Sequence, residues 1–132
     1  MVTNITDRLL LKKIYDLYYQ DFCKRQGKSD DSSGKIYIPI DCNLIAEQLK
    51  INPQIVFGRL YYSLDKKYRY KQENGSSVSL FSLKVGKEQH CIHFPMLSAV
   101  LAELEQSYYR FTIPIGISLF ALAFSILGFV TG

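Results

Sequence analysis

Two histidines and a cysteine lie close together at His90, Cys91 and His93. Imidazole and thiolate groups are the usual ligands of zinc, so metal chemistry would be expected here first. Side chains alternate between the two faces of a strand, which places Cys91 and His93 on one face and His90 on the other. A metal would need further ligands, and with two histidines in the chain Cys42 would have to contribute. We therefore expect no metal site and no cofactor, and interpret the run as part of a half-buried strand.

The sequence carries no other signature of catalysis. It has neither a glycine-rich phosphate-binding loop nor the motif of an activated nucleophile. Its three cysteines, Cys23, Cys42 and Cys91, are an odd number without a Cys-x-x-Cys pair. This pattern favours a reducing compartment over a disulfide framework. We expect a binding or anchoring protein and not an enzyme.

Charge is distributed unevenly along the chain. Every charged residue lies between Asp7 and Arg110, so the formal net charge of +4 belongs to the part before residue 111. A mild basic excess suits an anionic partner, either nucleic acid or lipid headgroups. The first residues also carry charges without an uninterrupted apolar stretch, so we expect no secretory signal there.

The uncharged C-terminal stretch 111–130 predicts a transmembrane helix. At about 1.5 Å per residue it spans about 30 Å, the thickness of the hydrocarbon core of a bilayer. Tyr108, Tyr109 and Arg110 precede it directly, and such residues are typical of the membrane–water interface. The anchor residues that we single out are Phe111, Pro114, Phe120, Phe124 and Phe129.

The flanking charge predicts the direction of the span. Arg110 and the basic residues before it favour a cytoplasmic N-terminal domain by the positive-inside rule, with no folded segment expected beyond Gly132. We therefore expect a single-pass protein of the lipid bilayer, with a soluble domain over 1–107 and an anchor over 108–132. Small residues four positions apart also allow a homo-oligomer in which the transmembrane helices pack closely together. The pairs are Ala121 with Ser125 and Gly128 with Gly132.

The N-terminal part predicts a helix, a loop and a strand. Asn4 and Asp7 are suited to start a capped helix that continues to about residue 24, with apolar residues at helical spacing. A stretch of small and polar residues over 27–34 indicates a loop. Alternating isoleucines over 35–40 predict a strand, which Pro39 would place at an edge or bring to an end.

Two helices separated by a tight turn are predicted next. Asp41 can cap the first, and Asn52 can cap the second, with Pro53 in its first turn. A glycine is usual at such a turn, so Lys50 must adopt a left-handed conformation or the turn must differ. The residues predicted to share the buried face of the second helix are Val56, Leu60 and Leu64.

The pattern after residue 67 becomes that of β-strands. Strands are predicted over 68–72, 78–83 and 89–94, with turns at Asn74-Gly75 and Gly86-Lys87. A further helix follows and continues into the anchor. The order helix, strand, helix, helix, hairpin, helix resembles a winged-helix domain over about 7–106, an α+β fold that contains a helix-turn-helix unit.

The resemblance implies a DNA-binding surface. In winged-helix domains the second helix of the motif enters the major groove of duplex DNA, and the hairpin contacts the backbone. It also implies that lysines near the hairpin meet phosphates, which adds affinity without reading sequence. The residues that would bind nucleic acid or a partner are Gln54, Phe57, Arg59, Tyr61, Tyr62 and Lys66 on the helix and Lys84 and Lys87 near the hairpin.

The aromatic residues of this helix leave a second function open. Base edges are read chiefly by Arg, Lys, Asn and Gln, of which the helix offers Gln54 and Arg59. Phe57, Tyr61 and Tyr62 instead resemble the aromatic anchors of protein interfaces, unless they are core residues. We expect a membrane-anchored DNA-binding or regulatory module, or alternatively an adaptor or membrane effector that docks a protein partner.

Overall fold

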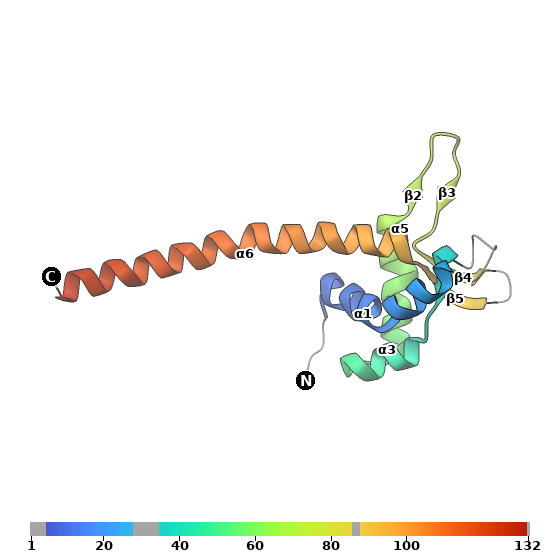
Figure 1. Cartoon of the computed structure of the whole chain (residues 1–132), viewed down its shortest axis with the longest axis horizontal. Coiled ribbons are helices and arrows are strands. Elements are labelled where there is room, and N and C mark those ends of the chain that lie inside the picture. The colour runs from blue at the N-terminus through green and yellow to red at the C-terminus, as the bar shows by residue number, and fades with distance from the viewer. Residues whose placement is uncertain (1–4, 28–34, 86–87, 132) are drawn as a thin grey trace. The chain divides into compact units, whose positions relative to one another are not determined.

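The computed structural model describes residues 5–27, 35–85 and 88–131, and only the backbone of residues 88 and 129–131. The chain combines helices with small antiparallel sheets and ends in one long apolar helix (Figure 1). It divides into two compact units, Met1–Leu101 and Ala102–Gly132, which we describe separately. The loop expected over 28–34 and the turn at Gly86-Lys87 lie outside the described residues.

Helix α1 (Asp7–Gln26) begins at a threonine cap. The hydroxyl of Thr6 accepts a hydrogen bond from the backbone N–H of Leu9 at 3.2 Å, which satisfies one of the free donors of the first turn. Asp7 is therefore the first helical residue and not the cap, and Asn4 lies outside the described residues. The buried residues of the helix are Leu10, Leu11 and Ile14.

The helix pair expected from the sequence is present. The carboxylate of Asp41 accepts from the N–H of Asn43 at 2.9 Å and caps α3 (Cys42–Leu49). Lys50 ends this helix at φ 59° and ψ 44°, and the N–H of Ile51 donates back to the Ala46 carbonyl. Of the two alternatives left open at the turn, the structure has the left-handed lysine, in a position where glycine is usually favoured.

A single helical stretch over residues 53–68 follows, which we call the third helix. It consists of α4 (Pro53–Gly58), a π-helical turn η1 (Arg59–Leu64) and α5 (Asp65–Tyr68). Val56, Leu60 and Leu64 are buried as predicted. The wider π turn differs from a regular helix because the N–H of Asp65 bonds the Leu60 carbonyl. Leu64 and Asp65, adjacent in sequence, are both buried there.

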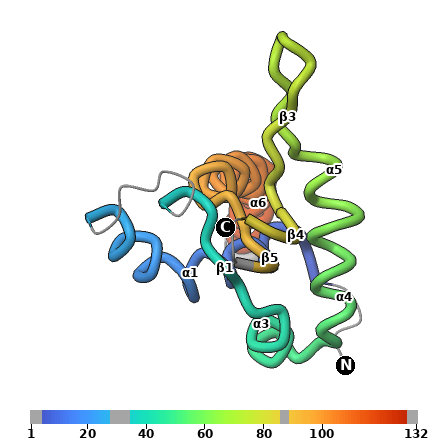
Figure 2. Tube along the Cα trace, turned by 90° about the vertical axis from the view of Figure 1, so that its right-hand side faces the viewer, coloured from blue at the N-terminus to red at the C-terminus, as the bar shows by residue number. Residues whose placement is uncertain are grey.

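Three strands form the main sheet, in the order β1-β5-β4. The strand β1 (Tyr37–Pro39) is antiparallel to β5 (Glu88–His93), which is antiparallel to β4 (Phe81–Val85). Ile92 is paired with Ile38 on one side and with Phe81 on the other, and all three are buried. In Figure 2, α1 lies beside β1 and the third helix beside β4.

A hairpin at the predicted turn Asn74-Gly75 confirms part of the prediction for residues 68–83 and corrects the rest. The strands β2 (Tyr70–Lys71) and β3 (Ser77–Val78) form a separate two-stranded sheet, which extends beyond the rest of the folded unit (Figure 1). The predicted strand over 78–83 is therefore wrong as one element, because it divides into β3 and β4. The division has a physical cause: the N–H groups of Leu80 and Phe81 bond a carboxylate instead of a neighbouring strand.

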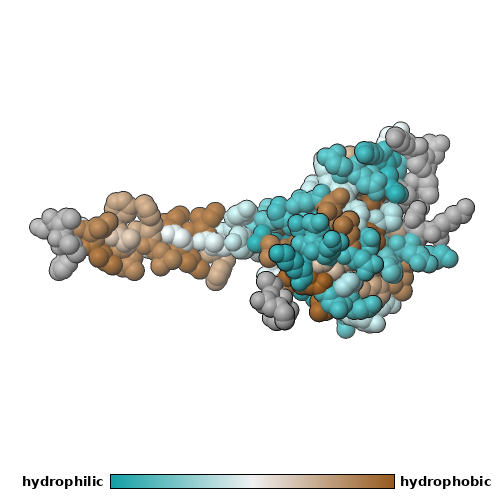
Figure 3. Space-filling view, turned by 90° about the horizontal axis from the view of Figure 1, so that it is seen from below, coloured by the Kyte–Doolittle hydropathy of each residue, from teal (hydrophilic) through white to brown (hydrophobic). Residues whose placement is uncertain are grey.

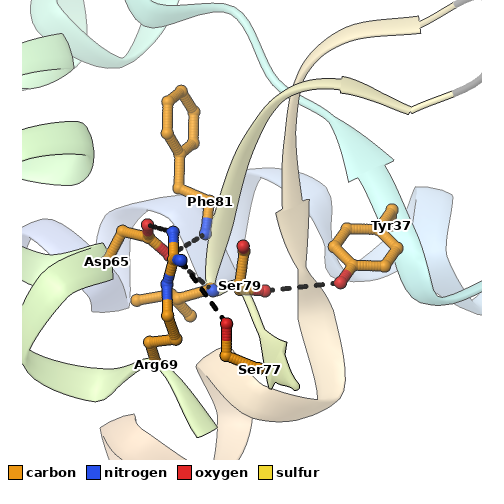
Figure 4. Close-up of polar contacts among 7 residues, drawn as sticks. Tyr37, Asp65, Arg69, Ser77, Ser79 and Phe81 are labelled. Atoms are coloured by element: carbon orange, nitrogen blue, oxygen red, sulfur yellow. Dashed lines mark hydrogen bonds and ion pairs between the residues drawn. The ribbon is translucent and has the colours of Figure 1, made fainter. Parts of the chain in front are cut away.

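That carboxylate belongs to Asp65, a buried charged residue at the start of α5. Its Oδ1 accepts from the N–H groups of Leu80 at 2.8 Å and Phe81 at 3.3 Å. Its Oδ2 pairs with the guanidinium of Arg69 at 2.6 Å, as Figure 4 shows. Buried carboxylates are costly unless they are paired and hydrogen-bonded, and here both oxygens have partners. Asp65 thus connects the end of the third helix to the start of β4.

The last helix, α6 (Phe94–Thr131), has a buried start. Phe94, Leu97, Val100 and Leu101 lie in the core of the first unit. The ring of Phe94 stacks on Phe22 at 4.6 Å between centroids, which fixes α6 against α1. The core is therefore closed by side chains from the first turns of this helix.

The second unit is long and apolar enough to cross a membrane. Over Phe94–Gly128, α6 contains an 18-residue window with a mean hydropathy of 2.0, none of which is buried. A core helix of a globular protein would bury such a window, because that is where its apolar side chains are stable. Figure 3 shows hydrophobic residues along this part of the helix.

We predict that Asp65→Ala destabilises the first unit by about 2–4 kcal/mol, because it leaves two buried N–H groups without an acceptor. Asp65→Asn, which keeps one acceptor oxygen, should cost less. Urea titration of the full chain in detergent micelles, followed by the near-ultraviolet circular dichroism of the tyrosines, measures the change. The exposed pair Lys12–Asp16 supplies the control, since Asp16→Ala should cost less than about 1 kcal/mol. Equal losses for Asp65→Ala and Asp16→Ala would contradict the role given to Asp65.

Candidate functional site

The third helix presents a polar and aromatic face to solvent. Gln54 is exposed near its start, and Tyr61 and Tyr62 are 37% and 71% exposed in its middle. The rings of Phe57 and Tyr61 are stacked at 5.5 Å, and the ring of Tyr62 meets Tyr61 edge-on at 5.0 Å. Phe57 is half-buried and also contacts Phe81 of the core. The three predicted aromatic residues therefore form one cluster that leads from the core to the surface.

Arg59, the cation predicted on this face, is engaged within the fold. Its guanidinium pairs with the carboxylate of Asp7 and donates to the carbonyl of Ile5. Both partners lie at the beginning of α1, and the ion pair is largely shielded from solvent. Arg59 thus fastens the third helix to α1, a contact between residues more than fifty positions apart in sequence.

Basic residues gather where the third helix ends and the β2–β3 hairpin begins. We call Lys66, Lys67, Arg69 and Lys71 the basic strip. Its lysines are all exposed, and the ammonium of Lys67 lies 5.1 Å from the ring centre of Tyr68. Arg69 differs, because its hydrogen bond to Asp65 and the charge of that carboxylate raise the pKa of Arg69. The lysines of the strip are therefore the cations best placed to meet an anionic partner.

The predicted hairpin lysines are separate from this strip. Lys84 is exposed on β4, in the main sheet, whereas the strip borders β2. Lys87 lies outside the described residues. The structure therefore brings Gln54, Phe57, Tyr61, Tyr62 and Lys66 onto one helix, with Lys84 on a different element.

The His90–His93 run has three different roles in the fold. His93 caps α6, since its Nδ1 accepts from the N–H of Met96 at 3.1 Å, and burial lowers the pKa of His93. Cys91 is buried in β5. His90 has an unusual φ of 54°, and its ring lies 5.5 Å from that of Phe57. Among the described residues, no group of three or more His, Cys, Asp or Glu could hold a metal ion.

Cys42, the other thiol considered for chemistry, is half-buried at the start of α3. Burial raises the pKa of the Cys42 thiol, and the charge of Asp41 raises it further. The protonated thiol is a poor nucleophile, because the thiolate is the reactive form. The shift therefore disfavours the reactive thiolate form of Cys42.

The anchor residues form an exposed apolar surface on α6. Phe111, Phe120 and Phe124 are all exposed, and the last two rings lie 4.8 Å apart. Pro114 lies inside the helix, and Phe129 is described by its backbone alone. Two hydroxyl side chains of this segment bond their own backbone. Thr112 donates to the Tyr108 carbonyl at 2.6 Å and Ser125 to that of Ala121 at 3.1 Å. Satisfied hydroxyls of this kind suit a helix without water around it.

Asp65 and the π turn are the features that sequence reasoning missed. The one local signal was the spacing of Asp65 and Arg69, four residues apart, which is a common ion-pair spacing on helices. Nothing in that spacing indicates burial or the two N–H donors at Leu80 and Phe81, because these come from a distant segment.

Comparison with protein-family models, with curated proteins and with solved structures finds no match to this chain. Function must therefore be argued from the arrangement of the side chains themselves.

We predict that the first unit loses stability as the pH falls below about 6.5, the ordinary pKa of histidine. The folded state lowers the pKa of His93, so neutral His93 stabilises the fold, and protonation removes the acceptor of the Met96 N–H. Asparagine also caps helices and does not titrate. His93→Asn should therefore abolish most of the loss, about 1 kcal/mol between pH 7.5 and 5.5, in urea titrations at the two pH values. An unchanged pH dependence in this variant would assign the effect to other groups.

Proposed function

We propose that the chain is a membrane-anchored winged-helix protein that binds duplex DNA through the third helix and the basic strip. The observation that carries the proposal is the exposed face of the third helix, with exposed Lys66 and Lys67 in its last turn and exposed Lys71 just beyond it on β2. A polar helix face bordered by cations matches what DNA offers, a groove of base edges between two rows of phosphates.

The order of the elements supports the winged-helix part of the proposal. A helix, a strand, two helices with a tight turn and a hairpin follow one another, and the first strand pairs with the last. In such domains the helix after the turn is the one that enters the major groove. The additional β2–β3 hairpin, inserted after the third helix, then extends the surface that could contact the DNA backbone.

The individual side chains suggest which of them would contact bases and which would contact phosphates. Gln54 is the exposed amide near the start of the third helix, and glutamine can make two hydrogen bonds to adenine in the major groove. Lys66, Lys67 and Lys71 would bind phosphates, which gives affinity without sequence preference. Lys84, on strand β4 of the main sheet, would contact the DNA backbone from a second element of the fold. Arg59 is assigned no contact with DNA, because Asp7 already holds it.

The membrane part of the proposal rests on α6. Its exposed apolar window is long enough for the hydrocarbon core, and Tyr108, Tyr109 and Arg110 flank it. The positive-inside rule places the basic first unit in the cytoplasm. A regulator held in this way would search only the DNA that approaches the membrane.

One observation favours a second candidate function, the docking of a protein partner. Phe57, Tyr61 and Tyr62 form an aromatic cluster in which Tyr62 is 71% exposed. Aromatic side chains dominate the binding energy of many protein interfaces. DNA is the better fit because the neighbouring cations are lysines, which protein interfaces disfavour.

We predict that the full chain in detergent micelles binds a random duplex with an affinity that falls steeply with salt. Replacing Lys66, Lys67 and Lys71 by alanine should lower the slope of log K against log[salt] by about 2–3, at about 0.9 per phosphate contact. Fluorescence anisotropy over a salt series measures the slope.

The matched control removes the same charge from α1, as Lys12→Ala, Lys13→Ala and Lys24→Ala together. This variant should retain a slope close to that of the parent. Equal effects of the two triple variants would mean that net charge alone drives binding. No binding at low salt would refute the DNA proposal and leave the protein-docking function, for which Tyr62→Ser is the variant that should lose the partner.

A further inference from the structure

A cavity of about 520 Å³ opens at the start of the third helix. Three segments form it: the junction between β1 and α3, the first turn of the third helix, and β5. Its volume lies within the range of about 300–1,000 Å³ that is usual for small-molecule sites. The lining residues are Ile40, Asp41, Cys42, Asn43, Pro53, Gln54, Phe57, Gln89 and His90. We call it the His90 cavity.

His90 is held in a strained backbone conformation at the wall of this cavity. Its φ of 54° is uncommon for any residue with a side chain, and it occurs here within a strand. The neighbouring chain stabilises this conformation, since the carbonyl of His90 accepts from the N–H of Ile40 at 2.9 Å. The imidazole ring lies 5.5 Å from the ring of Phe57 and 6.0 Å from that of Phe81. Strained residues that are held this firmly are concentrated at ligand sites.

The described residues that line the cavity do not favour an anionic ligand. No lysine or arginine is among the described residues that line it, and Asp41 contributes a carboxylate. The two helix starts at its edge are also occupied, because Asp41 accepts from the N–H of Asn43 and Asn52 from that of Gln54. Pro53 has no N–H to offer. Among the described lining residues an anion would find no lysine or arginine, and one N–H group at each helix start already has a side-chain partner.

The same lining suits a planar cation. The ring of Phe57 lines the cavity although one of its faces is stacked on Tyr61, and cations and flat rings bind favourably against aromatic rings. The amides of Asn43, Gln54 and Gln89 provide both donors and acceptors around it. Asp41 supplies the compensating charge at one end.

We propose that the His90 cavity binds a small planar organic cation, of the class of aromatic amidines and aminated heteroaromatic rings, with its ring against Phe57 and its charged group toward Asp41. Gln54 and Phe57 belong both to this cavity and to the exposed face of the third helix. A bound cation would therefore alter DNA binding, a consequence that rests on the proposed function. The binding itself does not depend on that function.

The first test is a titration of the full chain, in detergent micelles, with benzamidine and with benzoate. The two probes have similar shapes and opposite charges. Nuclear magnetic resonance should show saturable shifts for the side-chain amides of Asn43, Gln54 and Gln89 with benzamidine, and none with benzoate at equal concentration. The proposal is overturned if benzamidine causes no saturable shift, or if benzoate binds equally well.

Two variants locate the interaction. Asp41→Asn removes the charge and keeps the cap of α3, because asparagine caps helices as well as aspartate does, and it should weaken benzamidine binding about tenfold. Asp16→Asn, which removes a carboxylate from α1, should leave binding unchanged. Equal affinity of parent and Asp41→Asn would contradict the proposed orientation and with it the site.

A final arm separates this inference from the proposed function. Duplex binding is measured by anisotropy with and without benzamidine at constant ionic strength, with tetramethylammonium as the control cation. Benzamidine should change the affinity of the parent at least twofold, and that of Asp41→Asn much less. If benzamidine binds but no duplex does, the cavity stands and the DNA proposal fails. If a duplex binds but benzamidine does not, the cavity proposal alone fails.

Discussion

The arrangement of the first unit depends on one buried carboxylate. Asp65 takes up the N–H groups of Leu80 and Phe81 and so determines where β3 ends and β4 begins. Because the same residue starts α5, the end of the third helix and the edge of the main sheet are fixed to each other. This connection holds one side of the third helix against the sheet, so that its opposite face is the exposed one. A hydrogen-bonded and paired carboxylate serves here to specify geometry more than to add stability.

The two arginines and the lysines around the third helix have different roles for a physical reason. The guanidinium groups of Arg59 and Arg69 are held by Asp7 and Asp65, since a planar group with several donors suits a fixed carboxylate. Lysines keep their ammonium groups in water, as the basic strip does. The arginines therefore brace the fold, and the lysines are the cations left for an anionic partner. The exposed ammonium groups of these lysines favour a partner that carries phosphate groups.

Sequence reasoning succeeded where a local rule decides the structure. The apolar length of α6 and the buried positions of Val56 and Leu60 follow from residue spacing. For Lys50 it left a left-handed conformation and a different turn open, and the structure has the first. It failed for Asp65 and Arg59, whose partners lie far away in sequence. The alternation of side chains also predicted one strand over 78–83. Such a pattern carries no information about a hydrogen-bond acceptor from another element, here the carboxylate of Asp65. The helix that carries the candidate site is present as predicted, but the pairing of Arg59 with Asp7 was not foreseen.

We propose that one chain holds duplex DNA at a membrane. Liposomes carrying the full chain are mixed with a fluorescent duplex and floated through a density gradient, beside a chain that ends at residue 106. We expect the duplex to rise with the full-chain liposomes at low salt and to remain at the bottom at high salt. With the shorter chain, both protein and duplex should remain at the bottom. A full chain that carbonate removes from the liposomes, or a duplex that stays at the bottom at low salt, would contradict this proposal.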